Sequence, residues 1–193
     1  MQLPVAGPDG PVQQNLTRLL TIGHSNRTLE DFLAILQAHG VELLVDVRTV
    51  PRSRYNPQFN LENLPASMAA AGIGHIHMPG LGGLRHPRKD STNTGWRNDS
   101  FRGYADYMQT PEFTKNLEEL LPLAKDRRTA VMCAESVPWR CHRSLIADAL
   151  TARGIPVQHI MSATKANPHK LTSFARIDGE RVTYPSPELD LFP

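Results

Sequence analysis

The strongest constraint on the fold is a strand-like run of apolar residues that ends in charged ones. Residues 41–47 read VELLVDV, and a run this apolar is typical of a strand buried on both faces of a parallel sheet. Parallel strands need crossover connections, which are usually helices. Helical patterns do follow the strand-like segments, so the sequence predicts an α/β fold, a three-layer sandwich with a mostly parallel, Rossmann-like sheet of about five strands.

The expected elements follow the order βαβαβααβαβ. Strands are expected over residues 16–22, 41–47, 73–78, 129–133 and 157–160. Helices are expected over residues 29–38, 61–71 and 144–153, and two more follow residue 100, the second with Thr110 as its N-cap. Residues 79–100 form a long loop, which in a compact domain is usually functional or disordered. Beyond residue 177 the sequence fits either a small hairpin or a frayed end.

The length of the chain fits one domain. Its 193 residues suit a single core, which we expect over residues 16–184, with a flexible N-terminal tail over 1–15 and a C-terminal tail over 185–193. No apolar stretch approaches the ~20 residues that span a bilayer, which excludes a membrane protein. The first residues do not resemble a signal peptide, and two cysteines are too few for a disulfide scaffold, so we expect a cytoplasmic protein.

The distribution of charge says more than its total. The whole chain carries a formal charge of +2, but residues 48–102 hold eight basic and three acidic residues, a local charge of +5. The remainder therefore sums to −3. A basic middle in a mildly acidic body indicates a site for an anion, with a solvated basic face as the alternative.

Polar segments follow three of the predicted strands. They read GHSNR from residue 23, RTVPRSRYNPQF from residue 48 and AESVPWRCHR from residue 134. Because the carboxyl ends of parallel strands meet at one edge of a sheet, these segments are expected to form one polar pocket. We assign catalytic roles there to His24, Cys133, Glu135, Cys141 and His142, and ligand binding to Ser25, Asp46, Arg48, Ser53, Arg54, Arg85 and Arg143.

Two cysteines are candidates for a reactive thiolate. Cys141 opens a predicted helix, whose unpaired amides lower the pKa of a thiol. Cys133 ends a strand at the expected site. The structural alternative is that each is a small buried apolar residue, since free cysteine is among the most buried residue types.

The arginines after residue 47 suit bidentate contact with phosphate or carboxylate, because Arg48, Arg52 and Arg54 can present several guanidinium groups to one pocket. The alternative is internal pairing with Asp46 and Glu135, which would only fasten the loops. We expect Asp46 to orient Arg48 or a helix amide more readily than to act as a general base.

Several histidines are candidates for a role in catalysis, anion binding or metal binding. His24 suits a general base, an anion donor or a hydrogen-bonded loop residue. His75 and His77 lie on one face of a predicted strand and can join Cys133, Cys141 and His142 in a metal site, but no CxxC or HExxH spacing is present, so no metal is predicted. The sequence identifies no cofactor.

The segments TIGHSNR, LVDVRTVPRSRYNPQF, LGGLRHPR and MCAESVPWRCHRSLIADAL, in this order, resemble the family called domain of unknown function 488. The resemblance covers about residues 20–184. It implies an α/β cytoplasmic protein of bacteria or archaea whose motif residues share one polar site. These residues would be His24, Ser25, Asp46, Arg48, Pro51, Ser53, Arg54, Cys133, Glu135, Cys141, His142 and Arg143.

The chain is also similar to rhodanese-type sulfurtransferases, which carry a DVR strand and later a strand-Cys-loop-Arg-helix active site. Residues 46–48 and Cys133 occupy similar places. The loop differs, because it is short in that family, whereas nine residues separate Cys133 from Arg143 here.

Three functional hypotheses follow. The first is an enzyme-like anion pocket for a phosphate-bearing ligand, a nucleotide or a nucleic acid strand, held by Arg48, Arg54 and Arg143. The second is a non-catalytic nucleic-acid-binding module that uses residues 85–102 as a mobile basic arm. The third is thiol or sulfur transfer at Cys133 or Cys141. No membrane partner is expected, and the sequence leaves the substrate and the oligomeric state open.

Overall fold

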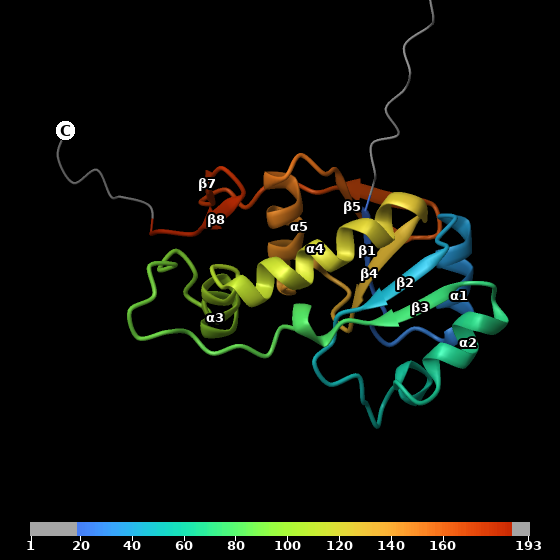
Figure 1. The fold of residues 1–193 in the computed structure, drawn as a ribbon. Coiled ribbons are helices and arrows are strands. Elements are labelled where there is room, and N and C mark those ends of the chain that lie inside the picture. Colours follow the sequence, from blue (N-terminus) through green and yellow to red (C-terminus); the bar gives the residue numbers. More distant parts are fainter. Residues whose placement is uncertain (1–18, 187–193) are drawn as a thin grey trace, which may run out of the picture.

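The centre of the molecule is a six-stranded sheet in the order β3-β2-β4-β1-β5-β6 (Figure 1). The computed structural model describes residues 19–186. The parallel strands are β1 (Leu19–Gly23), β2 (Leu43–Asp46), β3 (Gly74–His77), β4 (Thr129–Cys133) and β5 (Val157–Ser162), and β6 (Lys165–Pro168) runs antiparallel at the edge beside β5. The predicted mostly parallel sheet is therefore confirmed.

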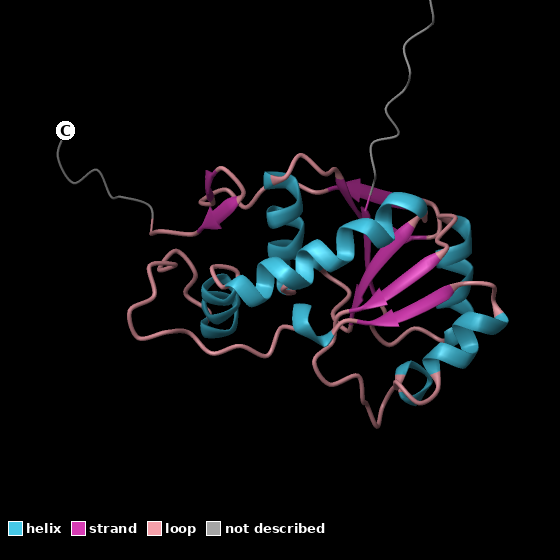
Figure 2. Ribbon diagram, in the orientation of Figure 1, coloured by secondary structure: helices cyan, strands magenta, loops and turns pink. Residues whose placement is uncertain are grey.

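Helices cover both faces of the sheet and complete the predicted three-layer sandwich (Figure 2). They are α1 (Leu29–Ala38), α2 (Leu64–Ala70), α3 (Asp99–Tyr107), α4 (Pro111–Asp126) and α5 (Arg143–Ala152), with short 3-10 turns at residues 57–59, 79–81 and 138–140. The predicted cap at Thr110 is present, since its hydroxyl accepts a hydrogen bond from the amide of Phe113, and Thr28 caps α1 in the same way through the amide of Asp31. Each bond satisfies an amide that the first helical turn leaves unpaired.

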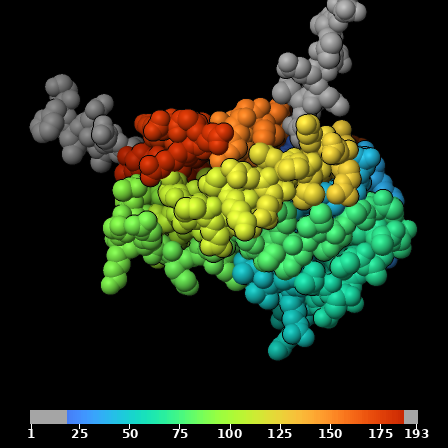
Figure 3. Space-filling view, in the orientation of Figure 1, coloured from blue at the N-terminus to red at the C-terminus, as the bar shows by residue number. Residues whose placement is uncertain are grey.

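Two hydrophobic cores lie on opposite faces of the sheet, because successive strand residues point in opposite directions. Leu19 of β1 packs with the cluster under α4 and α5, whereas Leu20 packs with the cluster under α1 and α2. All residues of β1, β2 and β4 are buried. In the space-filling view the yellow surface of α4 runs across one side of the molecule (Figure 3). The central strands are therefore covered on both faces, as the apolar run at residues 41–47 predicted.

The sequence prediction missed β6. Its residues, KANP, are polar and end in a proline, so they lack an apolar period. Proline is tolerated there because β6 is an edge strand.

The small C-terminal hairpin is present as β7 (Arg176–Asp178) and β8 (Arg181–Thr183), with Gly179 at a positive φ of 58° in the turn.

Parts of the predicted domain organisation lie outside the residues that the structure describes. The predicted tail over residues 1–15 and residues 187–193 of the predicted C-terminal tail lie beyond the described range. The range predicted for the domain, residues 16–184, stays a prediction. No helix within residues 19–186 is long and apolar enough to cross a membrane.

The order of the strands positions a site between β1 and β4. These strands are neighbours, with Gly23 paired to Cys133, but the helices that follow them lie on opposite faces, α1 on one and α5 on the other. A crevice therefore opens at their carboxyl ends, which is where parallel α/β sheets usually bind ligands. β2 lies on the far side of β4, so its end adjoins the same crevice.

Gly23 allows the loop after β4 to approach β1. A Cβ atom at this position would lie 1.8 Å from the Glu135 carbonyl oxygen and 2.8 Å from the Ser136 Cα atom.

We expect Gly23→Ala to lower the free energy of unfolding by about 3 kcal/mol, because the backbone of residues 135–136 must move to make room for the added methyl group. Urea unfolding measures this. The control, Gly72→Ala, places its Cβ atom more than 4 Å from every atom of residues 19–186 beyond its own residue and its two chain neighbours, and has a positive φ, so it should cost only about 1 kcal/mol. Equal losses would contradict the close approach.

Candidate functional site

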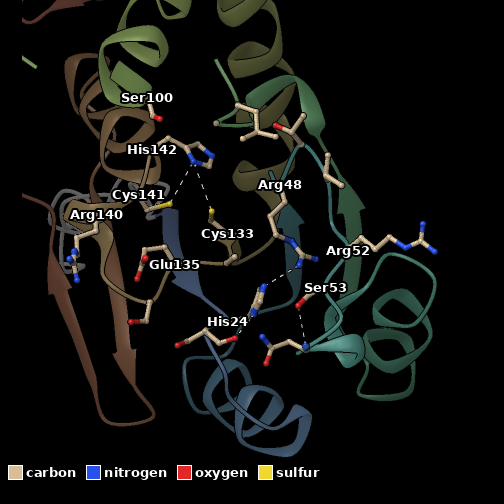
Figure 4. A pocket seen from close by; sticks show the side chains of 18 of the residues that line it. His24, Arg48, Arg52, Ser53, Ser100, Cys133, Glu135, Arg140, Cys141 and His142 are labelled. Carbon is tan, nitrogen blue, oxygen red and sulfur yellow. Dashed lines mark hydrogen bonds between the residues drawn. The ribbon is translucent and has the colours of Figure 1, made fainter. Parts of the chain in front are cut away.

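A cavity of about 670 Å³ lies at the carboxyl ends of β1, β2 and β4 (Figure 4). The segments that follow these strands form most of its wall, and residues 83–84 and 100–101 close one side. Eight of the sequence-assigned residues line it, namely His24, Ser25, Arg48, Ser53, Cys133, Glu135, Cys141 and His142. Asp46 and Arg143 are buried behind the wall.

Two assigned arginines lie elsewhere. Arg54 is exposed and borders a separate cavity that includes Glu62. The Arg85 guanidinium lies 3.5 Å from the centre of the Tyr107 ring and donates hydrogen bonds to the carbonyls of Gly80 and Gly82. Neither side chain lines the main cavity, so the expectation that they join the other residues there is not met.

Most hydrogen-bond donors of the Arg48 side chain bind to other residues of the protein. Its Nε and Nη2 atoms donate to the two carboxylate oxygens of Asp46, at 2.9 and 2.7 Å, and Nη2 also donates to the Phe59 carbonyl. Its Nη1 donates to His24 Nε2 at 3.1 Å. Four of its five N–H groups are thereby engaged. Asp46 neutralises the charge of Arg48 and orients it, which is the internal pairing that the sequence left open as the alternative.

His24 is held as a neutral ring. Its Nδ1 donates to the Ser25 carbonyl at 2.7 Å, so Nε2 is the acceptor for Arg48. Burial lowers the pKa of His24 to about 4, and the nearby charges of Arg48 and Arg143 lower it further, against the opposing effects of the Ser25 bond and Asp46. The ring also stacks on Phe59 at 4.3 Å. Both nitrogens are occupied, which leaves His24 without a free lone pair for general base catalysis.

Arg143 places a buried positive charge directly behind the cavity wall. Its side chain is 1% exposed. It donates to the Thr21 hydroxyl and to the carbonyls of Glu135 and Ser136, and its Nε has no hydrogen-bond partner among residues 19–186. All these acceptors are neutral, and within the described chain no carboxylate forms a salt bridge with Arg143.

A chain of hydrogen bonds leads from Arg143 to a distant carboxylate. Thr21 Oγ1 and His159 Nδ1 share a hydrogen bond of 2.7 Å, His159 Nε2 and His169 Nδ1 share one of 2.9 Å, and His169 Nε2 donates to Asp148 at 2.8 Å, because a carboxylate only accepts. Burial lowers the pKa of His159 to about 3, which agrees with a neutral ring.

Sequence reasoning missed this chain. Asp148 lies mid-helix in α5 and is fully buried, and it also accepts bonds from the hydroxyls of Thr172 and Tyr184. A carboxylate inside the otherwise apolar segment LIADAL is a usable signal, because such a group needs partners. The partners themselves come from distant parts of the chain and carry no local pattern.

The loop after β4 contains two backbone amides that have no hydrogen-bond acceptor among residues 19–186. Arg143 holds the Glu135 carbonyl, so the amide of Ser136, on the other side of the same trans peptide, points away from Arg143. The Ala134 carbonyl accepts from the amide of Ser25, which likewise turns the Glu135 amide the other way. Among residues 19–186 neither amide has an acceptor, and Ala134, Glu135 and Ser136 all line the cavity. We call residues 134–136 the amide loop.

Both cysteines face His142. The Nδ1 atom of His142 lies 3.7 Å from the Cys141 sulfur and 3.9 Å from the Cys133 sulfur (Figure 4), and both thiols are free. A hydrogen bond from Cys133, followed by the charge and amide of Arg143, lowers the pKa of Cys141 to about 6 against the effect of burial. The same bond and burial raise the pKa of Cys133 to about 12. Of the alternatives left open by the sequence, the electrostatics favour Cys141 as the thiolate.

A fold and a site of this kind define an α/β protein with a polar, cysteine-containing cavity at the sheet edge. The family model described as Domain of unknown function DUF488 matches residues 28–150, and the chain belongs to this family. The matched range includes Asp46, Arg48 and the segment from Cys133 to Arg143, and it begins after His24 and Ser25. No curated protein and no solved structure matches the chain.

The neutral state of His24 predicts a pH dependence of stability. Its pKa in the folded state, about 4, lies below the usual 6.5, so the unfolded chain binds more protons between these values. Stability is therefore fully present above pH 6.5 and falls as the pH drops toward 4. Between pH 7 and pH 5 this histidine accounts for about 2 kcal/mol.

The test compares urea unfolding of the wild type and His24→Gln at pH 7 and pH 5. The variant should lose less stability on acidification, whereas the control His86→Gln, at an exposed position, should behave like the wild type. An unchanged pH dependence in His24→Gln would show that this ring is not held neutral.

Proposed function

We propose that the cavity is an active site that binds a small phosphate-bearing molecule against the amide loop, with the Cys133–Cys141–His142 cluster as its reactive centre. The observation that carries this proposal is the buried charge of Arg143, with which no carboxylate of residues 19–186 forms a salt bridge. The sequence predicted Arg48 and Arg54 as direct phosphate ligands. This proposal does not use them in that role, because Arg48 is paired with Asp46 and Arg54 lies outside the cavity.

The cost of the buried charge supports an anionic ligand. A guanidinium group remains protonated in proteins, and an uncompensated buried charge costs several kcal/mol. Within residues 19–186 the hydrogen bonds of Arg143 go to one hydroxyl and two carbonyls, and no carboxylate forms a salt bridge with it. Its charge also stabilises the nearby Cys141 thiolate, and it sits behind the amide loop. An anion on the cavity side of that loop would be held by the amides of Glu135 and Ser136 and would compensate the charge behind them.

Two further cations border the opening. Arg140 and Arg52 line the cavity from opposite sides (Figure 4), both are exposed, and neither forms a salt bridge within residues 19–186. Their long side chains suit recruitment of an anion and bidentate contact with phosphate. A volume of about 670 Å³ also fits a nucleotide-sized ligand.

Glu135 takes the acid-base role in this proposal. Its carboxylate lines the cavity and is exposed, with only a 3.4 Å contact to the Val137 amide. His24 does not fit this role because both ring nitrogens are occupied. The free carboxylate beside the amide loop is thus the group best able to move a proton to or from a bound substrate.

A nucleic-acid module has less support. Its expected arm, residues 85–102, has two of its arginines in ion pairs, Arg88 with Asp90 and Arg102 with Asp99. Asp106 fastens the loop by accepting bonds from Ser91, Asn93 and the Arg88 amide. These ion pairs reduce the number of free cations that the arm could offer to phosphate backbones, although Lys89 and Arg97 stay exposed and form no salt bridge within residues 19–186.

Sulfur transfer is the second candidate for the same cluster, since Cys133 directly precedes the amide loop and both cysteines line the cavity. In this reaction the Cys141 thiolate attacks the outer sulfur of a persulfide donor, forms a Cys141 persulfide and releases the donor thiolate. Mass spectrometry would detect one added sulfur after treatment with such a donor.

The two free thiols also support the proposed cytoplasmic location, because cysteines stay reduced in the cytoplasm.

Phosphate binding tests the first proposal. By calorimetry, the wild type should bind inorganic phosphate and AMP, and Arg140→Gln should weaken both about tenfold, or about 1.4 kcal/mol, because a charge-assisted contact is lost. The matched control is Arg128→Gln, an exposed arginine just before β4, at the opposite edge of the sheet, which should bind as the wild type does. Absent binding, or equal weakening in both variants, would contradict the proposal. Tighter binding of a single-stranded oligonucleotide than of AMP would favour the nucleic-acid module.

A further inference from the structure

We infer that Cys133, Cys141 and His142 form a zinc site with an open fourth position. The three potential ligand atoms, two sulfurs and Nδ1, all lie within 4.8 Å of one another. Two thiolates and an imidazole are a ligand set that Zn²⁺ accepts in proteins, with water or substrate as the fourth ligand in catalytic sites.

The distances match the edges of a zinc tetrahedron. With Zn–S bonds of about 2.3 Å and a Zn–N bond of about 2.0–2.1 Å, tetrahedral geometry separates nitrogen from sulfur by about 3.6 Å and the two sulfurs by about 3.8 Å. The observed separations from Nδ1 are 3.7 Å to Cys141 and 3.9 Å to Cys133. The two sulfurs lie within 4.8 Å of each other, so a shift of at most about 1 Å would bring them to the tetrahedral separation and let the three atoms share one ion.

The surroundings of His142 also leave Nδ1 available for a ligand. Among residues 19–186 this nitrogen meets only the two cysteine sulfurs, which are weak hydrogen-bond partners. A metal ion at Nδ1 would replace two weak contacts with a coordinate bond.

The ring is fixed in the orientation that coordination needs. Tyr104 packs against it with ring centres 5.0 Å apart, and a Cβ atom at Gly83 would lie 2.4 Å from Nδ1. Gly83 therefore lets the loop at residues 82–84 close over the ring without displacing it. The two cysteines are likewise held, because Cys133 ends β4 and Cys141 directly precedes His142, the N-cap of α5.

The fourth position would face the cavity, since all three residues line it. There the ion would meet water or the bound anion beside the amide loop. This chemical consequence rests on the proposed function, whereas the coordination itself does not. Binding transfers no electrons: the thiols lose their protons to solvent as the Zn–S bonds form.

The test uses the full-length protein, reduced and stripped of metal with a chelator, and Co²⁺ as a spectroscopic probe. Titration should reach one ion per chain, with the intense visible bands of tetrahedral cobalt and a near-ultraviolet thiolate-to-cobalt band, and Zn²⁺ should displace the ion. Cys133→Ser, Cys141→Ser and His142→Gln should each weaken binding at least about 100-fold, because one ligand is lost. The control His86→Ala, at an exposed histidine, should bind as the wild type does.

A measurement on the wild type alone guards against variants that do not fold. Zn²⁺ should slow the reaction of both cysteines with a thiol reagent at least tenfold, and a chelator should restore it. Absent cobalt bands together with unprotected thiols would overturn the inference, as would bands that persist in folded Cys141→Ser. Arg140→Gln should keep full cobalt binding, so failure of the zinc site and failure of the anion site can be told apart.

Discussion

A buried positive charge that forms no salt bridge with a carboxylate of residues 19–186 is the constraint around which the candidate site is organised. Arg143 lies in the first turn of α5, almost fully buried, and its guanidinium group cannot shed its proton. It therefore donates hydrogen bonds to the carbonyls of Glu135 and Ser136 and to the hydroxyl of Thr21. In doing so it sets the shape of the loop after β4 and turns that loop's amides the other way.

The remaining polar groups divide into two layers around this charge. Behind it, Thr21, His159 and His169 connect Arg143 to Asp148 through a chain of hydrogen bonds, so the carboxylate partly balances the guanidinium from a distance. In front of it lie the cavity, the two cysteines and His142. The pairing of Asp46 with Arg48 belongs to the wall rather than to the ligand, and its net charge is close to zero.

The sequence was sufficient for the fold and for the segments that line the cavity, because both follow from local patterns. The apolar run that became β2 predicted a parallel sheet, and polar segments after three strands predicted where side chains would gather. It was insufficient for the direction of individual side chains. Arg85 follows the third strand as expected but packs on Tyr107, and whether Arg48 meets Asp46 or a ligand depends on rotamers. The chain to Asp148 joins residues far apart along the sequence, up to 138 positions for Thr21 and His159, so no spacing indicates it.

The most direct test of this account is the effect of phosphate on thermal unfolding in Arg143→Gln, which removes the buried charge and keeps hydrogen-bonding capacity. Phosphate should raise the melting temperature of the wild type, because a ligand that binds only the folded state stabilises it. A folded Arg143→Gln protein should show little or no such rise, whatever its own melting temperature. An undiminished phosphate effect in this variant would contradict the claim that the buried guanidinium holds an anion over the amide loop.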